Sequence, residues 1–132
     1  MDEKLAVVYR YFQLLEHFSV DAAEFAGIFH PNIIQTEYPN QMSNDIKQRN
    51  FDIILESMAT TRLILKSQHY SVLKAFENGN TLVVEAKWTG EIGVDAGKFR
   101  RGQVMKAFIC SIIEFRDGKI YRQRNYDCYE HQ

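Results

Sequence analysis

Cysteine and proline are scarce in this sequence, and their scarcity limits the chemistry that can be expected. Two cysteines and two prolines occur among 132 residues. Neither Cys110 nor Cys128 has a second Cys or His at the spacing of a zinc ligand set, and two cysteines cannot form a disulfide framework. We therefore expect two reduced structural thiols, no metal and no other cofactor.

Charge of one sign and long apolar runs are also lacking. Lys and Arg number 16 against 17 Asp and Glu, and the densest basic group is only Lys98, Arg100 and Arg101. Binding to nucleic acid through its phosphates needs clustered cations, so no nucleic-acid partner is expected. No apolar run approaches the roughly 20 residues that cross a bilayer, and residues 1–4 do not resemble a signal peptide. We expect a soluble cytoplasmic protein with no membrane partner.

What the sequence does contain is enough apolar material for a core. Hydrophobic residues make up 45% of the chain, and its length suits a single domain over residues 1–132. Helical periodicity dominates the first half and strand periodicity the second. This segregation predicts an α+β fold with helices on one face of an antiparallel sheet.

Three helices are predicted from apolar spacing and capping residues. The first covers Glu3 to Phe18, where apolar residues recur at helical intervals. The second covers Ala22 to Ile28 after Asp21, and Pro31 prevents its continuation. For the third, the possible N-caps Ser43, Asn44 and Asp45 precede an apolar helical pattern that extends to about Thr61.

In the first half, a short strand over Ile33 to Tyr38 follows the second predicted helix. The second half predicts a four-strand antiparallel meander, because after Arg62 the apolar period changes to two, most cleanly over Thr81 to Ile92. Asn78-Gly79 and Asp117-Gly118 are hairpin turn signals. The remaining predicted strands end near Phe76 and cover Val104 to Arg116 and Lys119 to Tyr129, with a loop over Gly93 to Gly102.

The strand from Val104 to Ile113 is apolar at both parities, so both of its faces should be covered. One layer of helices covers only one face of a sheet. A second copy of the chain, packed through the outer sheet face around a two-fold axis, is the simplest cover. We therefore expect a homodimer.

The element order and two segments, "IFHPNIIQTEYPN" and "IIEFRDGKIYRQRNYDCYE", resemble the nuclear transport factor 2-like superfamily. This group includes SnoaL-type polyketide cyclases and ketosteroid isomerases. The resemblance covers nearly the whole chain and implies three helices on a strongly curved antiparallel sheet, a cystatin-like cone, with a conical pocket. The pocket-lining residues it implies are Leu82, Val84, Ala86, Trp88, Ile109, Ser111, Ile113, Phe115, Tyr121, Gln123, Asn125 and Asp127.

Asp127 is the first catalytic candidate. Gln123, Asn125 and Asp127 alternate along the last predicted strand and share one side of it. If that side faces the pocket, burial raises the pKa of Asp127 and suits it to proton transfer. The alternative is that these side chains face solvent or satisfy helix ends.

Tyr11 and Glu37 are the other catalytic candidates. Tyr11 resembles in position the hydroxyl donor of ketosteroid isomerases, although a buried tyrosine bonded to a backbone carbonyl is the alternative. Glu37 and Tyr38 precede Pro39, where those isomerases place an aspartate base. Tyr38 stands in that place, and Ile113 stands near that of the second isomerase acid. Ketosteroid isomerisation is therefore not expected, although Glu37 could act as a base.

His30 follows the second predicted helix and could be a base or a partner of the helix dipole. The residues expected to contact a ligand are Asn125, Gln123, Trp88, Tyr38, His30 and Phe115.

Two functions remain open at this stage. One is an isomerase, cyclase or hydratase, or a binding protein, for a small apolar or carbonyl-bearing molecule, with Asp127 or Glu37 as the base and Tyr11 as the oxyanion donor. The other is a noncatalytic dimerisation or ligand-binding module whose pocket is filled by its own 17 aromatic residues.

Overall fold

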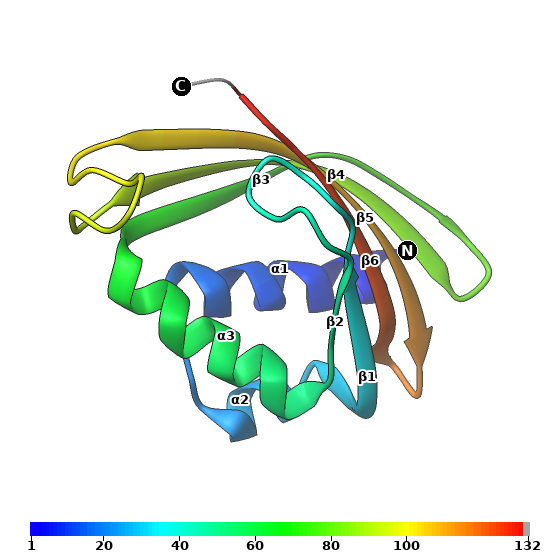
Figure 1. Cartoon of the computed structure of the whole chain (residues 1–132). Helices are drawn as coiled ribbons and strands as arrows, with labels where there is room; N and C mark the ends of the chain where they lie inside the picture. Colours follow the sequence, from blue (N-terminus) through cyan, green and yellow to red (C-terminus); the bar gives the residue numbers. More distant parts are fainter. Residues whose placement is uncertain (131–132) are drawn as a thin grey trace.

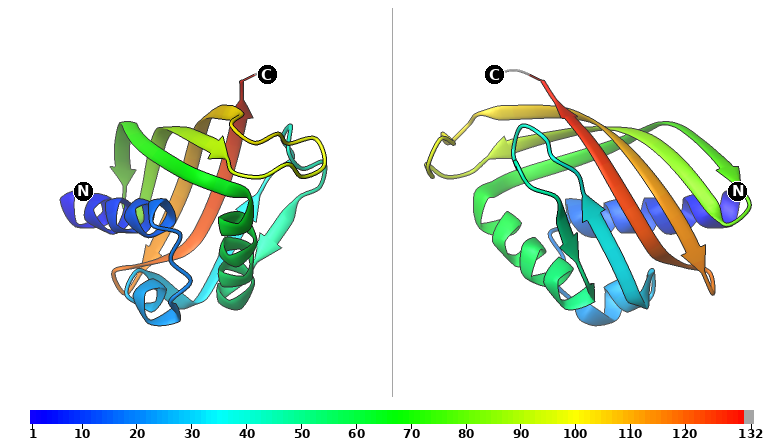
Figure 2. Two further views of the ribbon diagram at one scale, coloured as in Figure 1. Left: turned by 90° about the vertical axis from the view of Figure 1, so that its left-hand side faces the viewer. Right: turned by 45° about the vertical axis from the view of Figure 1, so that its right-hand side comes forward.

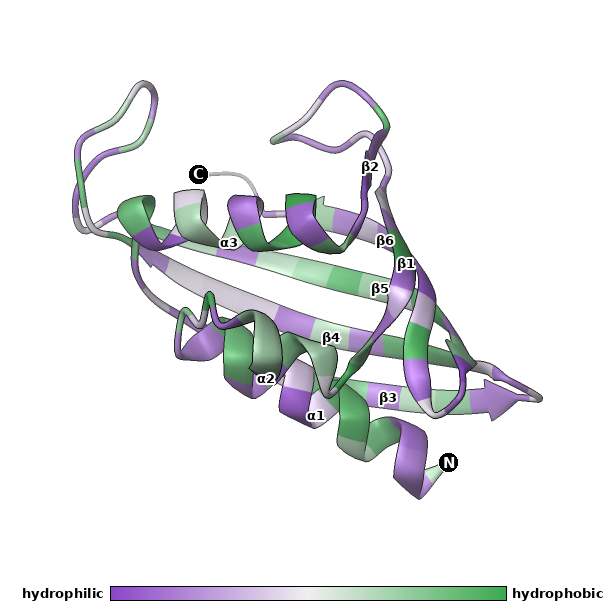
Figure 3. Ribbon diagram, turned by 90° about the horizontal axis from the view of Figure 1, so that it is seen from below, coloured by the Kyte–Doolittle hydropathy of each residue, from purple (hydrophilic) through white to green (hydrophobic). Residues whose placement is uncertain are grey.

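The computed structural model describes residues 1–130, and its helices all lie on the concave side of one curved sheet (Figures 1 and 3). No helix in this described part is long and apolar enough to cross a bilayer. The helices are α1 (Asp2–Glu16), α2 (Ala22–Ala26) and α3 (Phe51–Ile64), and the strands are β1 (Phe29–Glu37), β2 (Lys47–Arg49), β3 (Leu65–Asn78), β4 (Thr81–Ile92), β5 (Val104–Arg116) and β6 (Lys119–Tyr129).

The α+β class and the curved, open sheet are confirmed, but the sheet is mixed and not wholly antiparallel. Its strand order is β2-β1-β6-β5-β4-β3, and β1 pairs with β6 in parallel. Two hairpins, β3–β4 and β5–β6, depend on local turn signals and form as predicted. Gly79 and Gly118 adopt φ angles of 59° and 74° in their turns. The parallel pair joins segments far apart in sequence, for which no local signal exists.

The predicted start of the third helix is wrong. Asn50 caps α3, since its side chain accepts a hydrogen bond of 3.0 Å from the Ile53 amide. Ser43 instead belongs to a turn with Asn40, and Lys47–Arg49 pairs with the end of β1 as the short strand β2. Tertiary pairing overrode local capping preference here, and this change carries Arg49 to the site described below.

A bulge in β6 changes which residues face inward. The pairing with β5 shifts between Glu114 and Phe115, so that Ile120 is fully buried. The expected inward position of Tyr121 is therefore wrong. Its ring lies beside two guanidinium groups, those of Arg116 and Arg122, with the Arg122 carbon 3.9 Å from the ring centroid.

The core lies between the helices and the concave sheet face. Phe12 of α1 stacks on Tyr70 of β3 with ring centroids 4.5 Å apart. The side chain of Gln68 joins α1 to the sheet, because it donates to the Leu15 carbonyl at 2.7 Å and accepts from the Trp88 indole at 2.9 Å. These contacts hold Trp88 and Tyr70 at one end of the space under the sheet.

No helix of the described chain covers the convex sheet face (Figure 2). Val104 and Phe108 of β5 are each 47% exposed there, and Tyr126 of β6 is 42% exposed. The apolar side chains on the outer face of β5 are thus not covered by the described part of the same chain. The homodimer stays a prediction.

Candidate functional site

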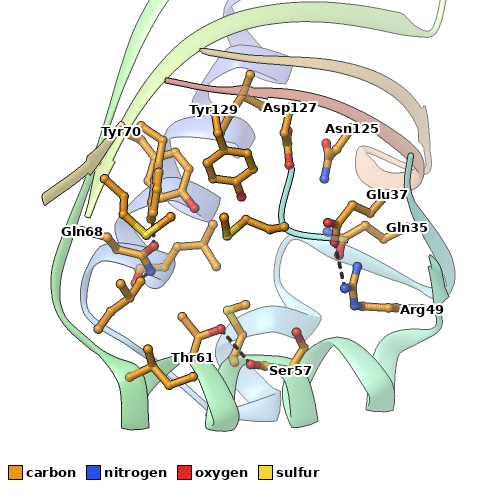
Figure 4. Close-up of a pocket in the computed structure, with 18 of the residues that line it drawn as sticks. Gln35, Glu37, Arg49, Ser57, Thr61, Gln68, Tyr70, Asn125, Asp127 and Tyr129 are labelled. Atoms are coloured by element: carbon orange, nitrogen blue, oxygen red, sulfur yellow. Dashed lines mark hydrogen bonds and ion pairs between the residues drawn. The ribbon is translucent and has the colours of Figure 1, made fainter. Parts of the chain in front are cut away.

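A cavity of about 320 Å³ lies between the concave sheet face and α3 (Figure 4). Every strand contributes to its lining, and so do α1 and α3. Met42 from the loop before β2 and Phe99 from the loop before β5 also line it. Its other lining residues are Tyr11, Leu15, Gln35, Glu37, Arg49, Ser57, Met58, Thr61, Ile64, Leu65, Gln68, Tyr70, Trp88, Ile92, Met105, Ile109, Asn125, Asp127 and Tyr129.

The polar side chains concentrate toward one end of the cavity. Figure 4 shows Glu37 and Gln35 of β1, Arg49 of β2 and Asn125 of β6 grouped on the same side of Asp127. Gln68 and Tyr70 lie toward the opposite end. An apolar space with a few convergent polar groups is the usual form of a small-molecule site.

Asp127 is the most strongly perturbed acid of this group. Its Oδ1 atom is buried and has no hydrogen-bond partner among the described residues. Burial, and secondly the negative charge of Glu37, raise the pKa of Asp127 to about 6, while the positive charge of Arg49 opposes them. This carboxyl group can therefore both accept and release a proton near neutral pH.

Glu37 is already engaged. One of its carboxylate oxygens accepts from Arg49 at 2.9 Å, and the other accepts from the Asn40 side chain at 2.9 Å. The Arg49 side chain is mostly buried, and burial strengthens such a pair by limiting solvent screening. Of the two candidate bases, Asp127 is the one left free to contact a ligand.

Asn125 belongs to a network of polar side chains that form part of the cavity wall. Its Oδ1 accepts from Ser111 Oγ at 2.6 Å and from Gln123 Nε2 at 3.2 Å. Gln35 Nε2 in turn donates to Gln123 Oε1 at 3.0 Å and to Tyr11 Oη at 3.1 Å. The network joins α1, β1, β5 and β6.

Three tyrosines add hydroxyl groups to the cavity. Burial raises the pKa of Tyr11, and it raises the pKa of Tyr70 and of Tyr129 further. All three therefore stay protonated at neutral pH and can donate hydrogen bonds to a ligand.

The structure brings together five of the nine residues predicted from the sequence to act in catalysis or to contact a ligand. Tyr11, Glu37, Trp88, Asn125 and Asp127 all line the cavity.

The other four residues expected to contact a ligand lie elsewhere. Gln123 is 2% exposed and lies within the wall, and Phe115 packs in the core at the far end of β5. Tyr38 has the opposite parity to Glu37 and stacks on the outward Tyr126, with centroids 4.8 Å apart. His30 precedes the irregular part of β1, and its ring packs against Tyr121 at 5.0 Å.

Several lining residues are absent from the prediction made from the sequence. Arg49 carries no usable local signal, because the capping residues before it predict helix where β2 forms. Tyr129 shares the strand parity of Asp127 and could have been found by extending the same alternation by one step. Gln35 and Tyr70 depended on strand pairings that local patterns do not contain.

Known structures share this architecture at low sequence identity. The chain is similar to IdmH of Streptomyces antibioticus, described as a candidate polyketide cyclase, at TM-score 0.78 and 10% identity, with 94% of this chain and 91% of that chain covered. A candidate SnoaL-like polyketide cyclase from Jannaschia sp. CCS1 gives TM-score 0.74 and 16% identity over 96% and 85% of the two chains. An LEH-like epoxide hydrolase from M. tuberculosis gives TM-score 0.68 and 14% identity over 98% and 84%.

No curated protein matches the sequence significantly. The SnoaL-like domain family matches residues 8–123, which begin within α1, include α2 and α3 and reach into the last strand. The chain therefore belongs to the SnoaL-like domain family.

Proposed function

We propose that the protein catalyses proton transfer at a carbon next to the carbonyl group of a small, mostly apolar molecule, with Asp127 as the general base. One observation carries this proposal: a buried carboxyl group with an unpartnered oxygen and a pKa of about 6 lines a largely apolar cavity. Buried carboxylates are ordinarily paired, so a ligand is the natural partner for this one.

The size and lining of the cavity support this class of ligand. A volume of about 320 Å³ is at the lower end of the range for small-molecule sites. With the Glu37–Arg49 pair neutral as a unit, an ionised Asp127 disfavours an anionic ligand. The similar proteins described as candidate polyketide cyclases and as an epoxide hydrolase support a reaction on a small molecule.

The test is hydrogen–deuterium exchange of 2-tetralone, a bicyclic ketone with acidic C–H bonds beside its carbonyl. Proton NMR in deuterium oxide follows the loss of those signals. We expect exchange with the wild-type protein and a loss of about 100-fold or more in Asp127→Asn. The rate should rise with pH and level off above about 6, since the base acts when ionised.

Asp117→Asn is the matched control, because this carboxyl group is 84% exposed in a hairpin turn outside the cavity lining. Exchange by Asp127→Asn at the wild-type rate would overturn the proposal.

Binding without catalysis is the second candidate. An apolar cavity flanked by the rings of Trp88, Tyr70 and Tyr129 favours ligand binding even if no proton moves. A rise in melting temperature with 2-tetralone, without exchange of its protons, would support this function instead.

We further propose that a second copy of the chain covers the convex sheet face. Phe76 of β3 and Phe108 of β5 are about half exposed there, and the pairing registers set Phe76, Val83 and Ile112 in one row across β3, β4 and β5. An uncovered apolar surface on neighbouring strands is typical of an interface.

A further inference from the structure

The orientation of the Asn125 side-chain amide determines what this residue offers to a ligand. Its Oδ1 accepts two hydrogen bonds, from Ser111 Oγ and Gln123 Nε2. An amide has one acceptor end and one donor end, so holding Oδ1 in the wall turns Nδ2 the other way. Figure 4 shows the nitrogen of Asn125 turned toward the cavity, beside the Asp127 carboxyl group.

This orientation is set by a chain of amides and not by Asn125 alone. Gln35 uses its Nε2 hydrogens on Tyr11 Oη and on Gln123 Oε1. Gln123 thereby has its oxygen occupied and presents its nitrogen to Asn125. Gln35 and Gln123 are 7% and 2% exposed, so water does not compete freely for these bonds.

The Asn125 nitrogen is left available. Within residues 1–130, no hydrogen bond takes up its Nδ2 hydrogens, although the group lines the cavity. Asn125 and Asp127 are two residues apart on β6 and therefore about 7 Å apart along one face of the strand. A donor and a proton acceptor thus lie on the same face of β6, and both line the cavity.

We propose that Asn125 Nδ2 is the hydrogen-bond donor to the oxyanion of the reaction, and that Gln123, Gln35 and Ser111 are positioning residues that orient it. The inference rests on the proposed proton transfer by Asp127 and deepens it. We assign the donor role to Asn125 because its Nδ2 faces the cavity beside the Asp127 carboxyl group, whereas Tyr11 Oη lies at the other end of the amide chain, where it accepts from Gln35 Nε2.

In the reaction, the Asp127 carboxylate takes a proton from the carbon beside the carbonyl group. The C–H electron pair becomes the C=C bond of an enolate, and the carbonyl π pair moves onto oxygen, where Asn125 N–H donates to it. Return of the proton from Asp127 to carbon, or to another carbon of the enolate, restores the carboxylate. No oxidant, reductant or second substrate is needed.

The kinetic test uses two variants in the 2-tetralone exchange assay. Asn125→Leu removes the donor at similar size, and we expect kcat to fall about 100-fold or more with KM nearly unchanged. Gln123→Met removes one of the two hydrogen bonds to Asn125 Oδ1 and leaves the one from Ser111. We therefore expect a smaller loss, of about 10-fold in kcat. Gln13→Met, at an exposed position of α1, is the matched control and should behave as wild type.

A structural readout keeps the inference separate from the proposed activity. In the ligand-free wild-type protein, the Asn125 side-chain amide protons should give NMR contacts to Ile109 and Asp127 and none to the Ser111 β-protons. Contacts to Ser111 instead would show a reversed amide and overturn the inference, whether or not the protein exchanges 2-tetralone.

If Asn125→Leu exchanges 2-tetralone as fast as the wild-type protein does, the donor role of Asn125 is overturned, while Asp127 remains the base. If Asn125→Leu does not fold, the Gln123→Met kinetics and the wild-type NMR contacts decide.

Discussion

Asp127 illustrates how one side chain can be costly to the fold and useful to a reaction. Its Oδ1 is buried without a partner among the described residues, an arrangement that destabilises the ionised form. The nearby negative charge of Glu37 destabilises ionised Asp127 further. The positive charge of Arg49 offsets only part of this effect, because Arg49 is paired with Glu37. Titratable groups perturbed in this way concentrate at functional sites.

The raised pKa predicts a specific pH dependence of stability. The pKa of Asp127 is about 6 in the folded protein against an ordinary value of 3.8, so the folded state holds the proton more tightly than the unfolded state. This stabilising contribution is complete below pH 4 and is lost as pH rises through 6. Relative to wild type, Asp127→Asn should therefore gain up to about 3 kcal/mol in free energy of unfolding between pH 4 and pH 8.

Urea unfolding of both proteins across this pH range measures the difference. Asp45→Asn, altered at an exposed position of the loop before β2, should show little pH dependence relative to wild type. A constant difference between wild type and Asp127→Asn would contradict the raised pKa.

At the scale of elements, strand alternation predicted more of the site than helix capping did. Alternation set Gln123, Asn125 and Asp127 on one side of β6, and that side faces the concave interior. The bulge ahead of Gln123 limits the pattern, because it brings Ile120 inward in place of Tyr121. Capping preference predicted helix where β2 forms, since the pairing of β2 with β1 is not visible locally.

The connection between α1 and β3 gives a second prediction. Gln68 satisfies both the Leu15 carbonyl and the Trp88 indole, so Gln68→Leu leaves two polar groups unpaired near the cavity. We expect a loss of about 1–3 kcal/mol in free energy of unfolding, measured by urea titration. The exposed neighbour variant Ser67→Ala should change stability little. Equal stability of the two variants would mean that Gln68 does not couple helix and sheet.

At the scale of the whole molecule, the helices protect only one face of the sheet (Figures 1 and 2). The concave face encloses the cavity and the core. The convex face presents exposed apolar groups on β3, β5 and β6, including Phe76, Phe108 and Tyr126. One fold therefore offers a site on one side and a surface suited to association on the other.

This arrangement predicts that a charge on the convex face disrupts self-association. Phe108→Glu should shift sedimentation velocity from dimer to monomer, because it buries a charge in an apolar contact. Leu63→Glu, at a residue of α3 that is 73% exposed, should leave the dimer intact. A monomeric wild-type protein would contradict the predicted homodimer.

The sequence by itself determined the elements whose signals are local. Apolar periodicity and turn residues specified α1, the two hairpins and the shared face of Gln123, Asn125 and Asp127, because such signals need only neighbours along the chain. The tertiary structure alone decided the parallel pairing of β1 with β6, the strand that brings in Arg49 and the amide network behind Asn125. These depend on contacts between segments up to about 90 residues apart, and the free energy of such contacts exists only once the sheet has curved and the helices have packed beneath it.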